Sequence, residues 1–234
     1  MCPGSPPTLV GCVAVSMAQI MHYWKYPDAA LGGYQSYNDW SGTFTGEVST
    51  TFGTPYGWDN MENSGAGEDT QRLLFETGVS VNMNYDYDGS GAYMDDAKSA
   101  LKDHFDYEST SGGYPISRNK SAYSDANWEN LIKNELDSGK PMIHRGCSDA
   151  GCHAWNLDGY DEDNYFHMNF GWGGYANGYY SLENISAGGD LYDDDLGVLE
   201  DITPANLSVP NLNLVEVNYS EASGSGDNDN VVNP

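Results

Sequence analysis

The chain has 234 residues, with 35 acidic against 9 basic side chains and a formal net charge of −26. This length is sufficient for one large domain, or for one domain and an appendage, with a sizeable core. No apolar run reaches the roughly 18 residues that a membrane span needs, so we expect no membrane span. The negative charge argues against nucleic acid and anionic membrane surfaces, which attract basic patches, and is compatible with a secreted protein.

The stretch Leu9–Tyr26 predicts a glycine turn, a cysteine and an amphipathic helix that ends before Pro27. Its apolar residues recur at helical spacing: Val13, Met17, Ile20, Met21 and Trp24. Cys12 therefore lies at the helix start, directly after Gly11. Free N–H groups and the helix dipole favour an anion there, which biases a thiol towards thiolate. The alternative at this point is a small, buried, unreactive cysteine.

The first half of the chain predicts further helices and one strand. Asp28–Gly67 is rich in Gly, Ser, Thr and Tyr, and predicts loops and short strands that cover the first helix. The alternating apolar residues of Val79–Tyr85 indicate a strand. Three more helices are expected from apolar spacing and end signals: Glu68–Thr77 with Gly78 as its stop, Asp95–Phe105, and Ala126–Ser138 capped by Asp125.

The second half changes character. Short strand-like runs are separated by Gly, Asp and Asn turns: Pro141–Arg145, His153–Leu157, Tyr165–Asn169, Gly178–Leu182 and a last one near Leu196–Ile202. Helices in the first half and an antiparallel sheet in the second give an α+β domain. After Pro204 the composition shifts, so residues 1–204 form the predicted domain. Residues 205–234 are a linker or the start of a further C-terminal module, with Leu207–Val217 as a possible extra strand.

Two of the four cysteines bracket a short turn. Cys147 and Cys152 flank the sequence SDAG and can form a local disulfide in an oxidising compartment. A zinc site that uses both with His153 is an alternative, but it lacks a second ligand pair at finger-like spacing. Cys2 has no evident partner.

A cysteine nucleophile needs a base within hydrogen-bond reach, and that base can be distant in sequence. His153 opens a predicted strand after a glycine turn, 141 residues beyond Cys12. This separation falls in the range of about 130–150 residues found in papain-type enzymes. The other histidines are weaker candidates, because they lie far along the first helix, in a polar helical stretch, or on strands where they can pack in a core: His22, His104, His144 and His167.

Three segments in order along the chain resemble one family. They are GCVAVSMAQIMHYWKYP, GCHAWNLDGYD and FHMNFGWGG, and the intervening GVSVNMNYDYDGSGAY is similar to it as well. Together they resemble the streptopain (SpeB-like) family of secreted bacterial cysteine proteases, over roughly Cys2–Pro204. The resemblance implies a papain-like fold. In that fold a helical half carrying the cysteine packs on a sheet half carrying the histidine, and the active site lies in the cleft between them.

The same resemblance implies roles for four residues. Cys12 is the expected nucleophile and His153 the general base and acid. Asn169 is expected to orient or polarise the imidazole, and Trp172 to shield the pair from water. For Asn169 the alternative is a turn asparagine, and for Trp172 an ordinary aromatic residue of the sheet.

Two positions depart from the family pattern. Family members carry a glutamine upstream of the nucleophile that helps to form the oxyanion hole, and Met1–Gly11 contains none. The resemblance thus implies a protease domain that is N-terminally truncated, with the glutamine upstream of Met1. The second departure is Cys152, which stands where the family usually has glycine.

The resulting prediction is a secreted or cell-surface cysteine endopeptidase that acts on protein or peptide substrates through a Cys12 thioester. We expect a monomer without cofactor or metal, and a precursor with an inhibitory propeptide. One alternative is a catalytically weak or silent acidic binding module of a larger secreted or surface protein. Another is a structural zinc domain.

Overall fold

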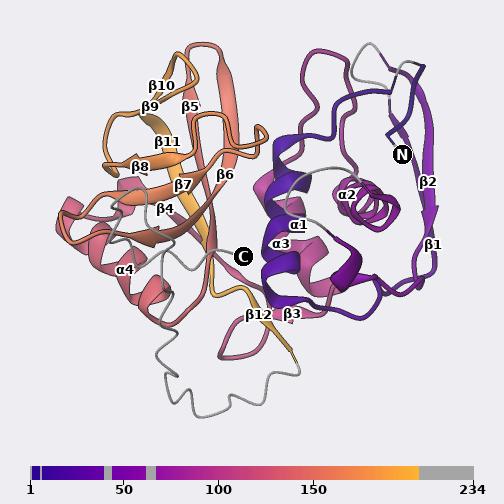
Figure 1. Ribbon diagram of the computed structural model, residues 1–234, viewed down its shortest axis with the longest axis horizontal. Helices are drawn as coiled ribbons and strands as arrows, with labels where there is room; N and C mark the ends of the chain where they lie inside the picture. The colour runs from indigo at the N-terminus through magenta and orange to yellow at the C-terminus, as the bar shows by residue number, and fades with distance from the viewer. Residues whose placement is uncertain (1, 6, 40–43, 62–66, 206–234) are drawn as a thin grey trace, which may run out of the picture.

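The computed structural model describes residues 2–5, 7–39, 44–61 and 67–205. Figure 1 shows two halves side by side, one built from the first three helices and the other from a sheet with a fourth helix. Helix α1 stands at the junction and faces the sheet. The structure therefore has the mixed α+β architecture, with N-terminal helices and a C-terminal antiparallel sheet, that the sequence predicts.

The N-terminal half consists of three helices and one hairpin. Its elements are α1 (Cys12–Trp24), β1 (Tyr34–Asp39), β2 (Gly46–Thr51), the short 3₁₀ helix η1 (Trp58–Asn60), α2 (Glu68–Ser80) and α3 (Met94–Asp103). The antiparallel β1–β2 hairpin lies at the outer edge beside α2 (Figure 1). The hairpin covers α2 rather than the first helix. Trp58 of η1, in the same stretch of chain, does lie against the first helix, with its ring centroid 6.4 Å from that of His22, so the expectation for residues 28–67 holds for η1 and not for the hairpin.

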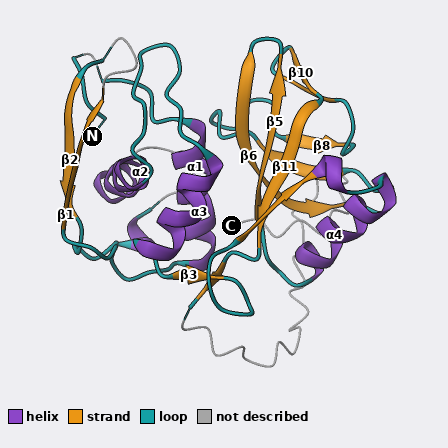
Figure 2. Ribbon diagram, turned by 180° about the vertical axis from the view of Figure 1, so that it is seen from behind, coloured by secondary structure: helices purple, strands orange, loops and turns teal. Residues whose placement is uncertain are grey.

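The C-terminal half is a six-stranded sheet in the order β4-β11-β5-β6-β7-β8, with every neighbouring pair antiparallel. Helix α4 lies on one side of it (Figure 2). The elements are β4 (Ile116–Asn119), η2 (Lys120–Ala122), α4 (Asp125–Asp137), β5 (Met142–Ser148), β6 (Gly151–Tyr160), β7 (Phe166–Asn169), β8 (Gly178–Tyr180) and β11 (Asp194–Glu200). Two small two-stranded sheets complete the described fold: β9 (Ile185–Ala187) with β10 (Asp190–Tyr192), and β3 (Tyr107–Glu108) with β12 (Thr203–Pro204).

The alternation of side chains along β5 and β6 divides the interior into two cores. Ile143 and Ala154 point towards α1 and join the core of the helical half. Their neighbours Met142 and Trp155 point to the opposite face and pack with Trp128 of α4. Successive strand residues face opposite sides of a sheet, so one strand pair can complete both cores.

The strand expected at Val79–Tyr85 is absent. Helix α2 continues through Gly78 to Ser80, and the chain turns at Asn82, whose φ is +49°. Gly78 does not end the helix; it lies against the hydroxyl of Tyr85, where a larger side chain would not fit. The alternating residues Val79, Val81, Met83 and Tyr85 are nevertheless buried. Their spacing therefore indicated which side chains enter the core, although the segment is irregular and not a strand.

Three smaller expectations also change. Helix α4 is capped by Ser124, whose Oγ accepts from the N–H of Asn127 at 3.3 Å, while Asp125 lies in the first turn. Strand β4 and the β9–β10 hairpin were not expected. The possible strand at Leu207–Val217 lies outside the described residues. Within those residues, none of the helices combines the length and hydropathy of a membrane crossing.

His144 is a core residue of the sheet half. It is 0 % exposed, and its ring stacks on Trp155 with the centroids 4.7 Å apart. Neither ring nitrogen has a hydrogen-bond partner within the described part of the chain. Burial lowers the pKa of His144 to about 3, and the charge of Arg145 acts in the same direction. The folded protein therefore holds this imidazole neutral.

We expect His144→Phe to remove an acid sensitivity of the fold. The unfolded imidazole has a pKa of about 6.5, so below that pH the unfolded chain binds a proton that the folded chain does not. Stability should be complete above pH 6.5 and fall by at most about 1.4 kcal/mol per pH unit as the pH drops towards 3. Urea unfolding of both proteins at pH 7.5 and 4.5, with the disulfide intact, measures this. Equal acid losses in the two proteins would contradict the assignment.

Candidate active site

Cys12 is held at the start of α1 by the glycine before it. Gly11 has a φ of +92°, and a Cβ there would lie 2.7 Å from the sulfur of Met83. Only glycine adopts this conformation and fits this space without strain. The preceding segment is fixed in turn, because Leu9 N–H donates to Asp86 O at 3.0 Å and Ser90 Oγ donates to Leu9 O at 2.7 Å. The cysteine therefore enters the helix at a defined position.

The sulfur of Cys12 lies near β6, a strand of the other half. Burial raises the pKa of the thiol, and the backbone N–H groups of Ala154 in β6, of Val13 and of Cys12 oppose this shift. The thiolate bias expected from the helix start is thus outweighed by desolvation of the sulfur.

His153 immediately precedes Ala154 in β6. Its Nε2 is 2.9 Å from the carbonyl oxygen of Phe170. A carbonyl can only accept, so Nε2 carries the hydrogen and the neutral ring keeps a lone pair on Nδ1. Burial lowers the pKa of His153, while the bond to Phe170 opposes this shift. The geometry fixes the tautomer that a base requires.

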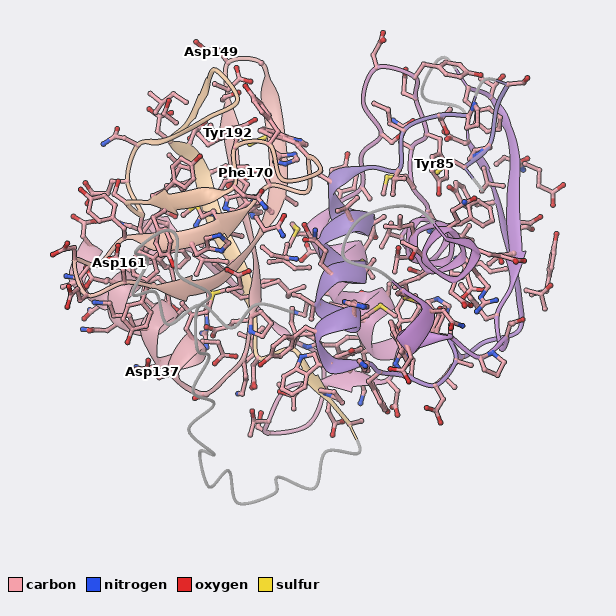
Figure 3. All side chains as sticks on the ribbon, viewed as in Figure 1. Tyr85, Asp137, Asp149, Asp161, Phe170 and Tyr192 are labelled. Carbon is pink, nitrogen blue, oxygen red and sulfur yellow. A yellow bond between two sulfur atoms is a disulfide. The ribbon has the colours of Figure 1, made fainter. Side chains whose placement is uncertain are left out.

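Aromatic rings surround the imidazole. Trp172 stacks on His153 with centroids 4.7 Å apart, and Tyr192 lies at 6.1 Å. The pKa of Tyr192 is raised mainly by burial, then by the charge of Asp190 and by that of Cys12. Figure 3 shows Tyr192 close to Phe170 in the sheet half. Gly188 packs closely against Trp172, because a Cβ at Gly188 would lie 2.7 Å from the indole.

Asn169 contacts the turn beside His153. Its Oδ1 accepts from the N–H of Gly171 at 3.0 Å and from Nε2 of Gln19 at 3.4 Å. The imidazole bonds instead to the carbonyl of Phe170, the next residue along. Sequence reasoning missed this carbonyl, because a backbone group has no signature in the residue types. It also missed Gln19, which looks like any polar residue of a helix.

The disulfide between Cys147 and Cys152 is present, as predicted. The two residues face each other across the β5–β6 hairpin, and the adjacent pair is Gly146 and His153. The link therefore ties the hairpin together next to the imidazole. It also removes both sulfurs as thiolate ligands, which contradicts the zinc alternative. Within residues 2–5, 7–39, 44–61 and 67–205, no three His, Cys, Asp or Glu side chains form a metal-binding group.

The mixed α+β fold carries Cys12 in its helical half and His153 in its sheet half. The Peptidase C10 family matches residues 2–180, and the chain belongs to this family. The streptopain resemblance seen in the sequence is thereby confirmed.

Individual relatives agree with this assignment. Streptopain of Streptococcus pyogenes is 30% identical over 187 residues, which cover 75% of this chain and 46% of streptopain. Thiol protease/hemagglutinin PrtT of Porphyromonas gingivalis is 33% identical over 224 residues, covering 90% of this chain and 25% of that protein. The chain thus spans a quarter to just under half of these curated relatives. The structure of active wild-type Prevotella intermedia interpain A cysteine protease matches with a TM-score of 0.75 and 26% identity over 87% of each chain.

Two glycines of the loop after Asn169 form a matched pair for testing how α1 supports the site. Gly171 has a φ of +74°, and a Cβ there would lie 2.8 Å from Val15 of α1. Gly173 has a φ of +64° and no atom within 4 Å of its Cβ position. We expect Gly173→Ala to cost about 1–2 kcal/mol of stability for the left-handed backbone alone. Gly171→Ala should cost about 1–3 kcal/mol more through overpacking against Val15.

Urea unfolding measures these costs, and the alkylation rate of Cys12 reports on the site. Only Gly171→Ala should slow alkylation of the folded protein, because it displaces the turn that holds His153. If both variants behaved alike, the contact with Val15 would not control the turn.

Proposed function

We propose that the chain is a papain-like cysteine endopeptidase in which Cys12 is the nucleophile and His153 the general base and acid. The observation that carries the proposal is the position of Cys12 at the start of α1, near the backbone of Ala154 in β6, together with the fixed tautomer of His153, the residue before Ala154. Nucleophilic catalysis by a thiol requires such a base beside the sulfur, oriented by a third group. The carbonyl of Phe170 is the third group.

The proton path follows from the tautomer. As the sulfur attacks a peptide carbonyl, its proton passes to Nδ1 of His153, and the Nε2–H bond to Phe170 stabilises the imidazolium. His153 then gives this proton to the leaving amine, and a thioester on Cys12 remains. In the second stage His153 takes a proton from water, whose oxygen attacks the thioester and frees the acyl product.

The start of α1 also supplies a hydrogen-bond donor for the oxyanion that develops during the reaction. The backbone N–H of Cys12 lies in the first turn, where N–H groups lack partners within the helix. Such donors stabilise the negative oxygen of a tetrahedral intermediate, and each is commonly worth a factor of about 10²–10³ in rate. One side-chain amide in addition would complete a two-donor hole.

Asn169 and Trp172 have supporting roles in this proposal. Trp172 covers one face of the imidazole and limits the access of water to the charged pair. Asn169 acts through the turn rather than by touching the ring, because its Oδ1 holds the N–H of Gly171 while the intervening Phe170 carbonyl meets His153. Both residues therefore keep the imidazole in one orientation.

We also propose that the protein works outside the cell. The Cys147–Cys152 disulfide is stable in an oxidising compartment, and such bonds are rare in the cytosol. A net charge of −26 keeps a protein soluble where salt screens its self-repulsion.

Selective alkylation tests the proposed pair. At pH 6 iodoacetamide should label Cys12 in preference to Cys2, and His153→Ala should slow labelling of Cys12 at least about tenfold. The reason is that burial raises the pKa of Cys12, so without a base to take its proton the sulfur forms little thiolate. Peptide mapping by mass spectrometry gives both rates in one sample, with Cys2 as the internal control.

Casein hydrolysis completes the test. The unchanged chain should cleave casein, and Cys12→Ala should not. A silent binding module would cleave nothing, and labelling of Cys2 with Cys12 inert would contradict the nucleophile.

A further inference from the structure

We propose that Gln19 is a positioning residue for the reaction of Cys12 and His153. Its side chain links α1 to two strands of the sheet and fixes the turn that holds the imidazole. This inference rests on the proposed function and adds a residue outside the reacting atoms.

Gln19 lies at the centre of a chain of side-chain amides across the junction. Its Oε1 accepts from Nδ2 of Asn156 in β6 at 2.8 Å. Its Nε2 donates to Oδ1 of Asn169, at the end of β7, at 3.4 Å. Asn156 and Asn169 are paired residues of neighbouring strands, so one helical side chain bridges both. The Nδ2 of Asn156 also donates to the carbonyl of Ser16, one turn earlier on α1, at 3.2 Å.

The groups at the two ends of this network determine which amide atom donates and which accepts in each bond. Asn169 Oδ1 already accepts from the N–H of Gly171 and can only be met by another donor. If the amide of Gln19 were reversed, its oxygen would face Oδ1 of Asn169 and its nitrogen would face the NH₂ of Asn156. Both contacts would then be repulsive. The network therefore has one favourable arrangement, and a half-satisfied version is costly in a largely buried site.

The hydrogen bonds of Gln19 reach the imidazole through the backbone of one turn. Asn169 and Gly171 flank Phe170, whose carbonyl holds Nε2 of His153. Gln19 is seven residues, about 10 Å, along the same helix as Cys12. Cys12 and the turn that bonds the imidazole are thus both fixed to α1. The packing of Gly171 on Val15 is a second anchor for this turn. A displacement of about 1 Å in such a geometry can cost about 10²-fold in rate.

Gln19→Met tests the proposal, because methionine has a similar length and shape but makes neither amide bond. We expect kcat to fall about ten- to a hundredfold with KM changed less than about twofold, since peptide binding does not involve this residue. The acid limb of the pH profile for Cys12 alkylation should also move to higher pH, because a displaced imidazole takes the proton less readily. Gln71→Met in α2 makes the same chemical change away from the sheet and should leave all three quantities unchanged.

A double-mutant cycle with Asn169→Ala identifies the route. If Gln19 acts through Asn169, Gln19→Met should have little further effect on kcat in the Asn169→Ala background. Thermal melting of each variant separates loss of folded protein from loss of positioning. Should Gln19→Met fold poorly, Gln19→Glu keeps an oxygen for Asn156 while its ionised form offers no donor to Asn169.

Unchanged kcat and pH profile in folded Gln19→Met would overturn the proposal, as would fully multiplicative effects in the cycle. The proposed function can fail separately. If the unchanged chain does not cleave the peptide, the endopeptidase assignment is wrong. The alkylation profile then still shows whether Gln19 controls the imidazole.

Discussion

The docking of α1 between the helical half and the sheet is the constraint on which the rest of the structure depends. One face of the helix, with Met17 and Met21 at 0 % exposure, fills the core of the helical half. The other face meets the sheet through Val15, Ser16 and Gln19, which contact the strands or the loop after β7. The first residue of this helix is Cys12. The same packing that forms the hydrophobic core therefore fixes where the sulfur meets β6.

The electrostatics of the site follow from that burial. Desolvation raises the pKa of Cys12 and lowers that of His153, so the isolated groups both favour their neutral forms. Transfer of the proton from sulfur to nitrogen creates two opposite charges that attract strongly in a medium of low dielectric constant. Backbone groups then hold both charges: N–H groups at the sulfur and the carbonyl of Phe170 at the imidazolium. The protein thus supplies fixed dipoles where water would otherwise reorganise.

The sequence predicted the parts of this arrangement that depend on residue type and periodicity. Helix α1 carries a clear apolar stripe, and the spacing of Cys12 and His153 together with three motifs identified the family. Backbone and network features left no such signal. The Phe170 carbonyl is one example, and Gln19 needs the tertiary fold before its partners are near. Strand β4 is short and polar at a sheet edge, so its local pattern did not predict a strand. Val79–Tyr85 alternates in apolar residues but has no partner strand, so its local pattern predicted a strand that does not form.

If α1 and β6 together position Cys12 as the nucleophile, its sulfur should accept an acyl group from a substrate. The most direct measurement is to mix the folded chain with a peptide p-nitrophenyl ester, quench in acid after milliseconds to seconds, and map the adduct by mass spectrometry. We predict a burst of p-nitrophenol with one acyl group per chain, attached to Cys12 and lost on hydroxylamine treatment as a thioester would be. Turnover of the ester without any acyl group on Cys12, or with the acyl group on another residue, would contradict it.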